Sequence, residues 1–208
     1  MTPNKSNAFD ELAANLTAQL PPAPRIAVIG STSFWHPDSE ATCQLIGAQL
    51  AQLNPLLLLT GGVPGVGEAV GRSFFAACGS AEQRTFHVLP ADSAAWDYGV
   101  TLFGGRTMAE RRKVLGRMSP IYLVIEGGPG TAHEHQVASK RGATIVPVGR
   151  TGGHAGTIYP RTTKPTAAAP ADWEALGSAE PAEIATAVAS IMRAVIAAEG
   201  DAAPPQTG

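Results

Sequence analysis

Six short apolar segments alternate along this chain with segments of helical periodicity, and that alternation constrains its fold more than any other feature. Each apolar segment is hydrophobic at successive positions, which is typical of strands that are buried on both faces. Strands of this kind form a parallel sheet covered by helices, so we predict a single α/β domain with a doubly wound, mostly parallel sheet. The predicted strands are residues 25–30, 56–62, 84–90, 98–105, 121–128 and 144–149.

Helical patterns fill the stretches between these strands and extend toward both ends of the chain. Residues 1–24 are predicted to form a short amphipathic helix, which packs on the domain or mediates self-association, and a proline-rich linker. Residues 25–198 are predicted to form the domain, and residues 199–208 a flexible tail. The apolar positions of the first helix are Phe9, Leu12, Leu16 and Leu20, and the later helices are predicted at 38–53, 65–78, 106–118, 131–141 and 181–198.

Composition and charge argue against several classes of function. The chain has 15 Lys+Arg against 17 Asp+Glu, so no overall positive field is present to hold nucleic-acid phosphates or an anionic membrane. Apolar runs stop far short of the roughly 18 residues that a membrane-spanning helix needs, and the N-terminus lacks the pattern of a secretory or transit signal. Cys43 and Cys78 fit neither a disulfide framework nor a metal-ligand pair. We therefore expect a cytoplasmic protein that binds neither nucleic acid nor membrane.

Five of the six predicted strands run into loops of glycine and small polar residues. In a parallel sheet such loops share the carboxyl edge, where ligands bind at the point at which the strand order reverses. Glycine lets backbone N–H groups approach an anion, and the next helix N-terminus adds a favourable dipole. We predict a small phosphorylated ligand, the alternative being that the loops only make tight turns. The loop residues expected to hold it are Gly30, Ser31, Thr60, Gly61, Gly62, Gly127, Gly128, Gly130 and Thr131.

Residues 151–179 are rich in Gly and Pro and have few apolar anchors. A structureless connection of this length is uncommon inside a compact domain and is often a functional lid. The segment is therefore expected to be either a lid that brings His154 or Arg161 to the ligand, or a surface excursion pinned by Trp173.

The candidate functional side chains are most concentrated after the fourth and fifth predicted strands. Arg111 and Arg112 lie in a helix that opens just after a glycine pair, and a guanidinium there would pair bidentately with a phosphate or carboxylate. Glu134 lies directly behind a glycine loop, in the first turn of the next helix. Thr131 and Glu134 also have the Thr-x-x-Glu spacing of a capping box, which is the structural alternative to a functional carboxylate.

Two of these segments resemble a known family. Residues 127–134, Gly-Gly-Pro-Gly-Thr-Ala-His-Glu, match the family's Pro-Gly-Gly-x-Gly-Thr-x-x-Glu loop after its first position, and residues 108–112, Met-Ala-Glu-Arg-Arg, match its Met-x-x-Arg-Lys helix in the same register. The chain thus resembles, over residues 25–150, the Lonely Guy proteins, long mislabelled lysine decarboxylases. These belong to a wider Rossmann-like group that includes molybdenum cofactor carrier proteins and nucleotide-sensing domains.

The resemblance implies an enzyme that hydrolyses the N-glycosidic bond of a purine, or N6-substituted cytokinin-type, nucleoside 5′-monophosphate without any cofactor. Arg111 would bind and orient the substrate, and Glu134 would stabilise the positive charge that develops at the anomeric carbon and steer the attacking water. The alternative is a non-catalytic nucleotide or molybdenum-cofactor carrier, which needs the glycine loops but not this pair. The resemblance also implies a homodimer, with the final helix or the helix of Arg111 at the contact.

This chain departs from the family pattern at several positions. Glu126 stands where the family has proline, and a second carboxylate beside the phosphate loop would repel the ligand unless it turns away or pairs with an arginine. Alternatively, Glu126 contacts a ribose hydroxyl or the base. Arg112 replaces lysine, and His133 replaces an acidic neighbour of Glu134. Because His133 and His135 diverge on a helix, they do not form a zinc pair, and no metal is predicted.

Overall fold

The computed structural model describes residues 5–79 and 83–201, and the predicted tail beyond residue 201 lies outside them. Its core is a six-stranded sheet of order β4-β3-β2-β1-β5-β6 in which all neighbouring strands are parallel. The predicted doubly wound α/β class is confirmed. The strands are β1 (Arg25–Gly30), β2 (Leu57–Thr60), β3 (Thr85–Leu89), β4 (Val100–Phe103), β5 (Ile121–Ile125) and β6 (Thr144–Val148).

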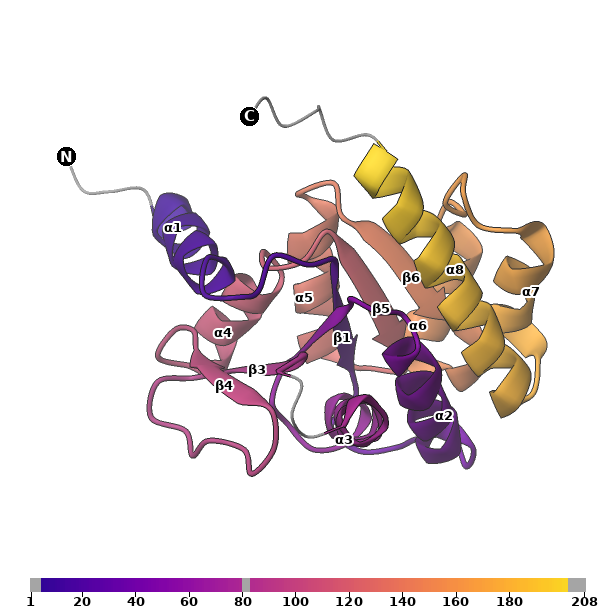
Figure 1. Ribbon diagram of the computed structural model, residues 1–208, viewed down its shortest axis with the longest axis horizontal. Coiled ribbons are helices and arrows are strands. Elements are labelled where there is room, and N and C mark those ends of the chain that lie inside the picture. The colour runs from indigo at the N-terminus through magenta and orange to yellow at the C-terminus, as the bar shows by residue number, and fades with distance from the viewer. Residues whose placement is uncertain (1–4, 80–82, 202–208) are drawn as a thin grey trace.

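Helices cover both faces of this sheet (Figure 1). Alternate residues of β1 face opposite ways: Ile26 and Val28 pack with α2, α3, α7 and α8, whereas Ala27 and Ile29 pack with α1, α4, α5 and α6. Burial on both faces is the reason that the strands read as continuous apolar runs. The helices are α1 (Lys5–Thr17), α2 (Ser39–Ala51), α3 (Val66–Cys78), α4 (Met108–Leu115), α5 (Pro129–Ser139), α6 (Gly153–Ile158), α7 (Pro170–Ser178) and α8 (Pro181–Asp201).

The first and last helices are both part of the packed domain. Helix α1 lies against α4 (Figure 1), where Leu16 is buried and Asp10 accepts hydrogen bonds from Arg117 (3.0 Å) and Arg141 (2.6 Å). Residues 181–200 of α8 are long and apolar enough to cross a membrane, contrary to the sequence-based expectation that no segment is. In the folded chain, however, the apolar stripe of α8 packs against α2 and α7 as part of the core.

The predicted structureless connection over residues 151–179 is wrong. This stretch contains α6, α7 and two short 3₁₀ helices, η1 (Gly149–Thr151) and η2 (Tyr159–Arg161). The Tyr159 ring stacks on Trp173 at 5.7 Å between centroids, and its hydroxyl donates to the Trp173 carbonyl at 2.8 Å. Helices this short carry too few turns for their periodicity to be recognised in the sequence.

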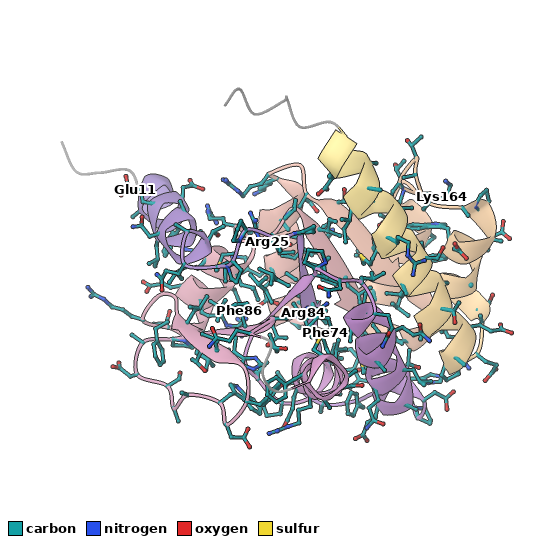
Figure 2. All side chains as sticks on the ribbon, in the orientation of Figure 1. Glu11, Arg25, Phe74, Arg84, Phe86 and Lys164 are labelled. Atoms are coloured by element: carbon teal, nitrogen blue, oxygen red, sulfur yellow. The ribbon has the colours of Figure 1, made fainter. Side chains whose placement is uncertain are left out.

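Two arginines bind backbone carbonyls at the amino edge of the sheet and are labelled in Figure 2. Arg25 Nε donates to the Met118 carbonyl at 2.6 Å, and Arg84 Nε donates to the Leu56 carbonyl at 2.9 Å. The Arg84 guanidinium also lies over the Phe74 ring, 5.2 Å from its centroid. These cations therefore serve the fold at the edge opposite the glycine loops.

Candidate functional site

A cavity of about 240 Å³ opens over the carboxyl ends of β1 and β5. Because β1 pairs with β2 on one side and β5 on the other, this is the point at which the strand order reverses, where ligands bind in folds of this class. Most of the residues proposed from the sequence come together here. Those that line the cavity are Gly30, Ser31, Gly61, Arg111, Arg112, Gly128, Gly130, Thr131 and Glu134.

Arg111 and Glu134 form a buried ion pair in the cavity wall. Arg111 Nη1, from α4, donates to Glu134 Oε1, from α5, and the two side chains are 3% and 7% exposed. Burial raises the pKa of Glu134, an effect that Arg111 opposes, and burial likewise lowers the pKa of Arg111. Arg111 Nε has no hydrogen-bond partner among the described residues, so the guanidinium retains a donor.

The capping-box interpretation of Thr131 and Glu134 is wrong. Helix α5 begins at Pro129, two residues earlier than predicted, so Thr131 lies inside its first turn and donates its hydroxyl to the Gly30 carbonyl at 2.9 Å. Glu134 is paired with Arg111 instead. The helix N-cap is Gly128, which has no side chain to occupy the helix N-terminus, and Gly128, Pro129 and Gly130 line the cavity.

Two glycines make room for the two guanidinium groups. A Cβ atom at Gly61 would lie 2.6 Å from Arg111 Nη1, and a Cβ atom at Gly130 would lie 2.9 Å from Arg112 Nη2. Distances under 3.0 Å are not tolerated by real Cβ atoms, so any side chain at either position would displace an arginine. The glycines therefore allow close approach of cationic side chains, and the anion contact expected from the sequence stays a prediction.

Glu126 does not line the cavity: of the alternatives expected from the sequence, its carboxylate turns away from the cavity, and it pairs with no arginine among the described residues. It is fully buried at the end of β5, with the left-handed φ of +51°. Its Oε1 accepts hydrogen bonds from the Trp35 and His36 amides at 3.0 Å each and from the Ser39 hydroxyl, and its Oε2 accepts one from the Ser31 hydroxyl. The carboxylate thus organises the loop between β1 and α2, a role that its neighbours in sequence did not indicate.

Three more of the proposed ligand contacts lie outside the cavity lining. Thr60 Oγ1 contacts His87 Nδ1 at 2.8 Å and accepts a hydrogen bond from the Gly62 amide at 3.2 Å. Gly61, between them, lines the cavity. Gly127, with φ +98°, packs against the Thr131 side chain. These three residues therefore stabilise the conformations of the loops and do not line the cavity.

Sequence reasoning missed part of the lining. Thr32, Ser33 and Trp35 come from the loop after β1, which has no periodicity to mark it, and Met108 begins α4. Trp35 is 56% exposed, and only its position in the fold connects it with the cavity.

The two candidate lid residues lie elsewhere. His154 contacts His135 at 3.1 Å between Nε2 and Nδ1, and Arg161 is exposed. Neither lines the cavity, because α6 is held to the β5 loop by hydrogen bonds from the His154 and Ala155 amides to the carbonyls of Gly127 (2.7 Å) and Glu126 (2.9 Å). The segment around α6 is packed on the loop after β5, and the expectation that His154 or Arg161 belongs to a lid is wrong.

Comparisons with known proteins agree with this architecture. The solved structure of TM1055, a structural genomics target, is similar with a TM-score of 0.56 and 26% identity, over 66% of this chain and 81% of that one. The molybdenum cofactor carrier protein of Chlamydomonas reinhardtii matches with a TM-score of 0.51 and 26% identity, over 59% and 75% of the two chains. The molybdenum cofactor binding protein of Rippkaea orientalis matches with 0.51 and 25%, over 59% and 74%.

Sequence comparison points the same way. No curated protein sequence matches this chain significantly. The profile of the SLOG cluster4 family matches residues 23–172, which include the sheet, the cavity and both motif segments. The resemblance to the Lonely Guy group of Rossmann-like proteins is thereby confirmed at the level of this wider group, and the chain belongs to the SLOG cluster4 family.

Proposed function

We propose that this protein hydrolyses the N-glycosidic bond of a purine nucleoside 5′-monophosphate to the free base and ribose 5-phosphate. The observation that carries the proposal is the meeting of Arg111 and Glu134 in the wall of a cavity built from glycine loops. Helix N-termini and loop amides suit a phosphate, and a fixed carboxylate suits a cationic transition state. The cavity therefore offers both groups that this reaction requires.

In the proposed reaction, the bond between C1′ and the base nitrogen breaks while the oxygen of a water molecule bonds to C1′. One proton of the water passes to the leaving base, and the other remains on the new hydroxyl. Glu134 stabilises the positive charge that develops at C1′ and orients the water. Arg111 holds Glu134 by its Nη1 and lines the cavity, where its guanidinium would orient the substrate.

A carrier of a phosphorylated, ring-containing cofactor is the second candidate. Two similar structures are of a molybdenum cofactor carrier and a molybdenum cofactor binding protein. A carrier uses the glycine loops and needs no carboxylate at a reacting carbon. The two candidates therefore differ in what they require of Glu134.

Incubation with AMP and other nucleoside monophosphates, with free base and ribose 5-phosphate both quantified, tests the proposal. We expect release by the wild-type protein and a loss of roughly 10²-fold or more in Glu134→Gln, since a preorganised charge at the reacting centre contributes on that order. Glu180→Gln, an exposed glutamate just before α8, is the matched control and should retain full activity.

The outcomes separate the two candidates. Tight AMP binding without base release, unchanged in Glu134→Gln, would contradict hydrolysis and favour the carrier. Absence of both binding and release would contradict a nucleotide ligand altogether.

A further inference from the structure

We propose that Trp35 is the platform on which a planar ring of the ligand stacks, and that Glu126 is the positioning residue that fixes this platform. The inference deepens the proposed function and rests on it, because it names which part of a nucleotide this cavity discriminates. It assigns a role to two side chains that the reaction itself does not use.

The indole lies at the wall of the cavity, against two glycine loops. A Cβ atom at Gly128 would lie 3.4 Å from Trp35 Cη2, and one at Gly153 would lie 2.9 Å from Cζ3. One edge of the ring therefore rests on the N-terminus of α5, where the phosphate is expected, and on the start of α6. Trp35 lines the cavity, and 56% of the residue is exposed.

Exposure alone carries no argument, because single exposed aromatic residues are common on protein surfaces. What distinguishes Trp35 is how its backbone is held. Its amide and that of His36 donate to one oxygen of Glu126, a carboxylate with no exposure to solvent. A buried carboxylate that accepts three hydrogen bonds from this loop and a fourth from Ser39, at the start of α2, fixes the loop in place, since each lost bond would leave charge unsatisfied.

The loop is also held from a second side. Arg150, in η1, lies 3.5 Å from Asp38 and contacts His36. A ring held at a fixed place before the ligand arrives loses little conformational entropy on binding, which favours affinity. The loop after β1 is thus built to present the indole rather than to fold over the ligand.

The lining combines cationic and apolar side chains. Arg111 and Arg112 supply the cationic groups, and Trp35, Met108 and Val63 supply apolar surface to the same cavity. Met108 is 37% exposed and, like Trp35, is among the few large apolar side chains that remain so. This combination fits a ligand that carries both an anionic group and a flat heteroaromatic ring, which is the chemistry of a purine nucleotide.

Calorimetric titration with AMP and with ribose 5-phosphate tests the platform, because only AMP carries the ring. In Trp35→Ala we expect AMP affinity to fall about tenfold or more, in the range measured for loss of one base–aromatic stack. Ribose 5-phosphate affinity should stay at its wild-type value, and Trp35→Phe should recover most of the AMP affinity. Trp173→Phe is the matched control, since Trp173 stacks on Tyr159 and does not line the cavity.

The possible results are distinguishable. Unchanged AMP affinity in Trp35→Ala would overturn the platform while leaving the proposed hydrolysis intact. Equal losses for AMP and ribose 5-phosphate would also overturn it, because Trp35 would then support the phosphate cradle and not the ring. If the wild-type protein binds neither compound, both the proposed function and this inference fail.

The role of Glu126 has a spectroscopic test. With Trp96 and Trp173 replaced by phenylalanine, the remaining fluorescence comes from Trp35. We expect Glu126→Gln, which puts amide hydrogens against donor groups, to lower the fluorescence anisotropy of Trp35 and the AMP affinity while circular dichroism still reports a folded protein. Ser39→Ala removes a single donor to Glu126 outside the cavity and should give a smaller change in the same direction. Unaltered anisotropy in a folded Glu126→Gln protein would overturn the positioning role.

Discussion

At the scale of single residues, the cavity depends on two glycines as much as on the arginines that they lie against. Gly61 and Gly130 lie so close to Arg111 and Arg112 that neither glycine has room for a methyl group. The guanidinium positions are therefore set jointly by α4, which carries both arginines, by Gly61 in the loop after β2, and by Gly130 in the first turn of α5. Sequence reasoning identified all four residues as site residues but assigned the glycines to phosphate contact alone.

Gly61→Ala is expected to displace the Arg111 guanidinium from Glu134. Since a misplacement of about 1 Å in a catalytic group costs on the order of 10²-fold in rate, kcat/KM for base release from AMP should fall by about that factor. Gly200→Ala is the matched control, because a Cβ atom at Gly200 meets no other atom within 4 Å. Equal activity of Gly61→Ala and wild type would show that Arg111 is not held in its present position during the reaction.

At the scale of secondary-structure elements, β2 and β3 are joined beneath the Gly61 loop by a buried polar network. Tyr98 O can only accept, so His87 Nε2 donates to it at 3.1 Å and Nδ1 accepts from the Thr60 hydroxyl at 2.8 Å. This arrangement requires the neutral imidazole. Burial accordingly lowers the pKa of His87 to about 4.

We expect the free energy of unfolding to decrease as pH falls from about 6.5, the usual histidine pKa, toward 4. In that window the unfolded chain binds a proton at residue 87 that the folded chain does not, and the full loss is about 3 kcal/mol. Urea denaturation at several pH values measures it, and His87→Gln should flatten the dependence. If wild type and His87→Gln lose stability in parallel with pH, His87 is not the group responsible.

The starts of α4 and α5 show that a local capping pattern does not by itself predict a cap. The Thr-x-x-Glu pattern does cap a helix in this chain, but at α4: Thr107 Oγ1 accepts from the Glu110 amide at 3.2 Å, and Glu110 accepts from the Arg106 amide at 2.8 Å. The same spacing at Thr131 and Glu134 does not form a cap, because the Thr131 hydroxyl binds the Gly30 carbonyl and Glu134 binds Arg111. Whether a Thr-x-x-Glu sequence caps a helix thus depends on which groups the fold places beside its side chains.

At the scale of the whole molecule, the homodimer and the cytoplasmic location stay predictions. β4, which precedes α4 in the chain, is an edge strand with a row of backbone groups not paired within the sheet, and its Phe103 is 43% exposed; an edge of this kind can pair with a second copy of the chain. We expect light scattering at micromolar concentration to give about twice the chain mass of 21.4 kDa. Phe103→Asp should shift it toward the single-chain value if the contact lies on the α4 side. A monomeric mass for the wild-type protein would contradict the dimer.

The direct ion pair of Arg111 and Glu134 was not predicted, although the family resemblance placed both residues at one site. The sequence by itself predicted the fold class, the six strands with the helices between them, and a ligand site at the carboxyl edge of the sheet. It did so because buried parallel strands have continuous apolar runs, and because glycine loops after such strands necessarily share one edge of the sheet. Only the tertiary structure decided that Glu126 is an internal anchor, that Trp35 borders the cavity, and that residues 153–178 contain the helices α6 and α7. Those outcomes depend on contacts between segments far apart in the chain, for which no local pattern exists: 91 positions separate Trp35 from the carboxylate that holds it.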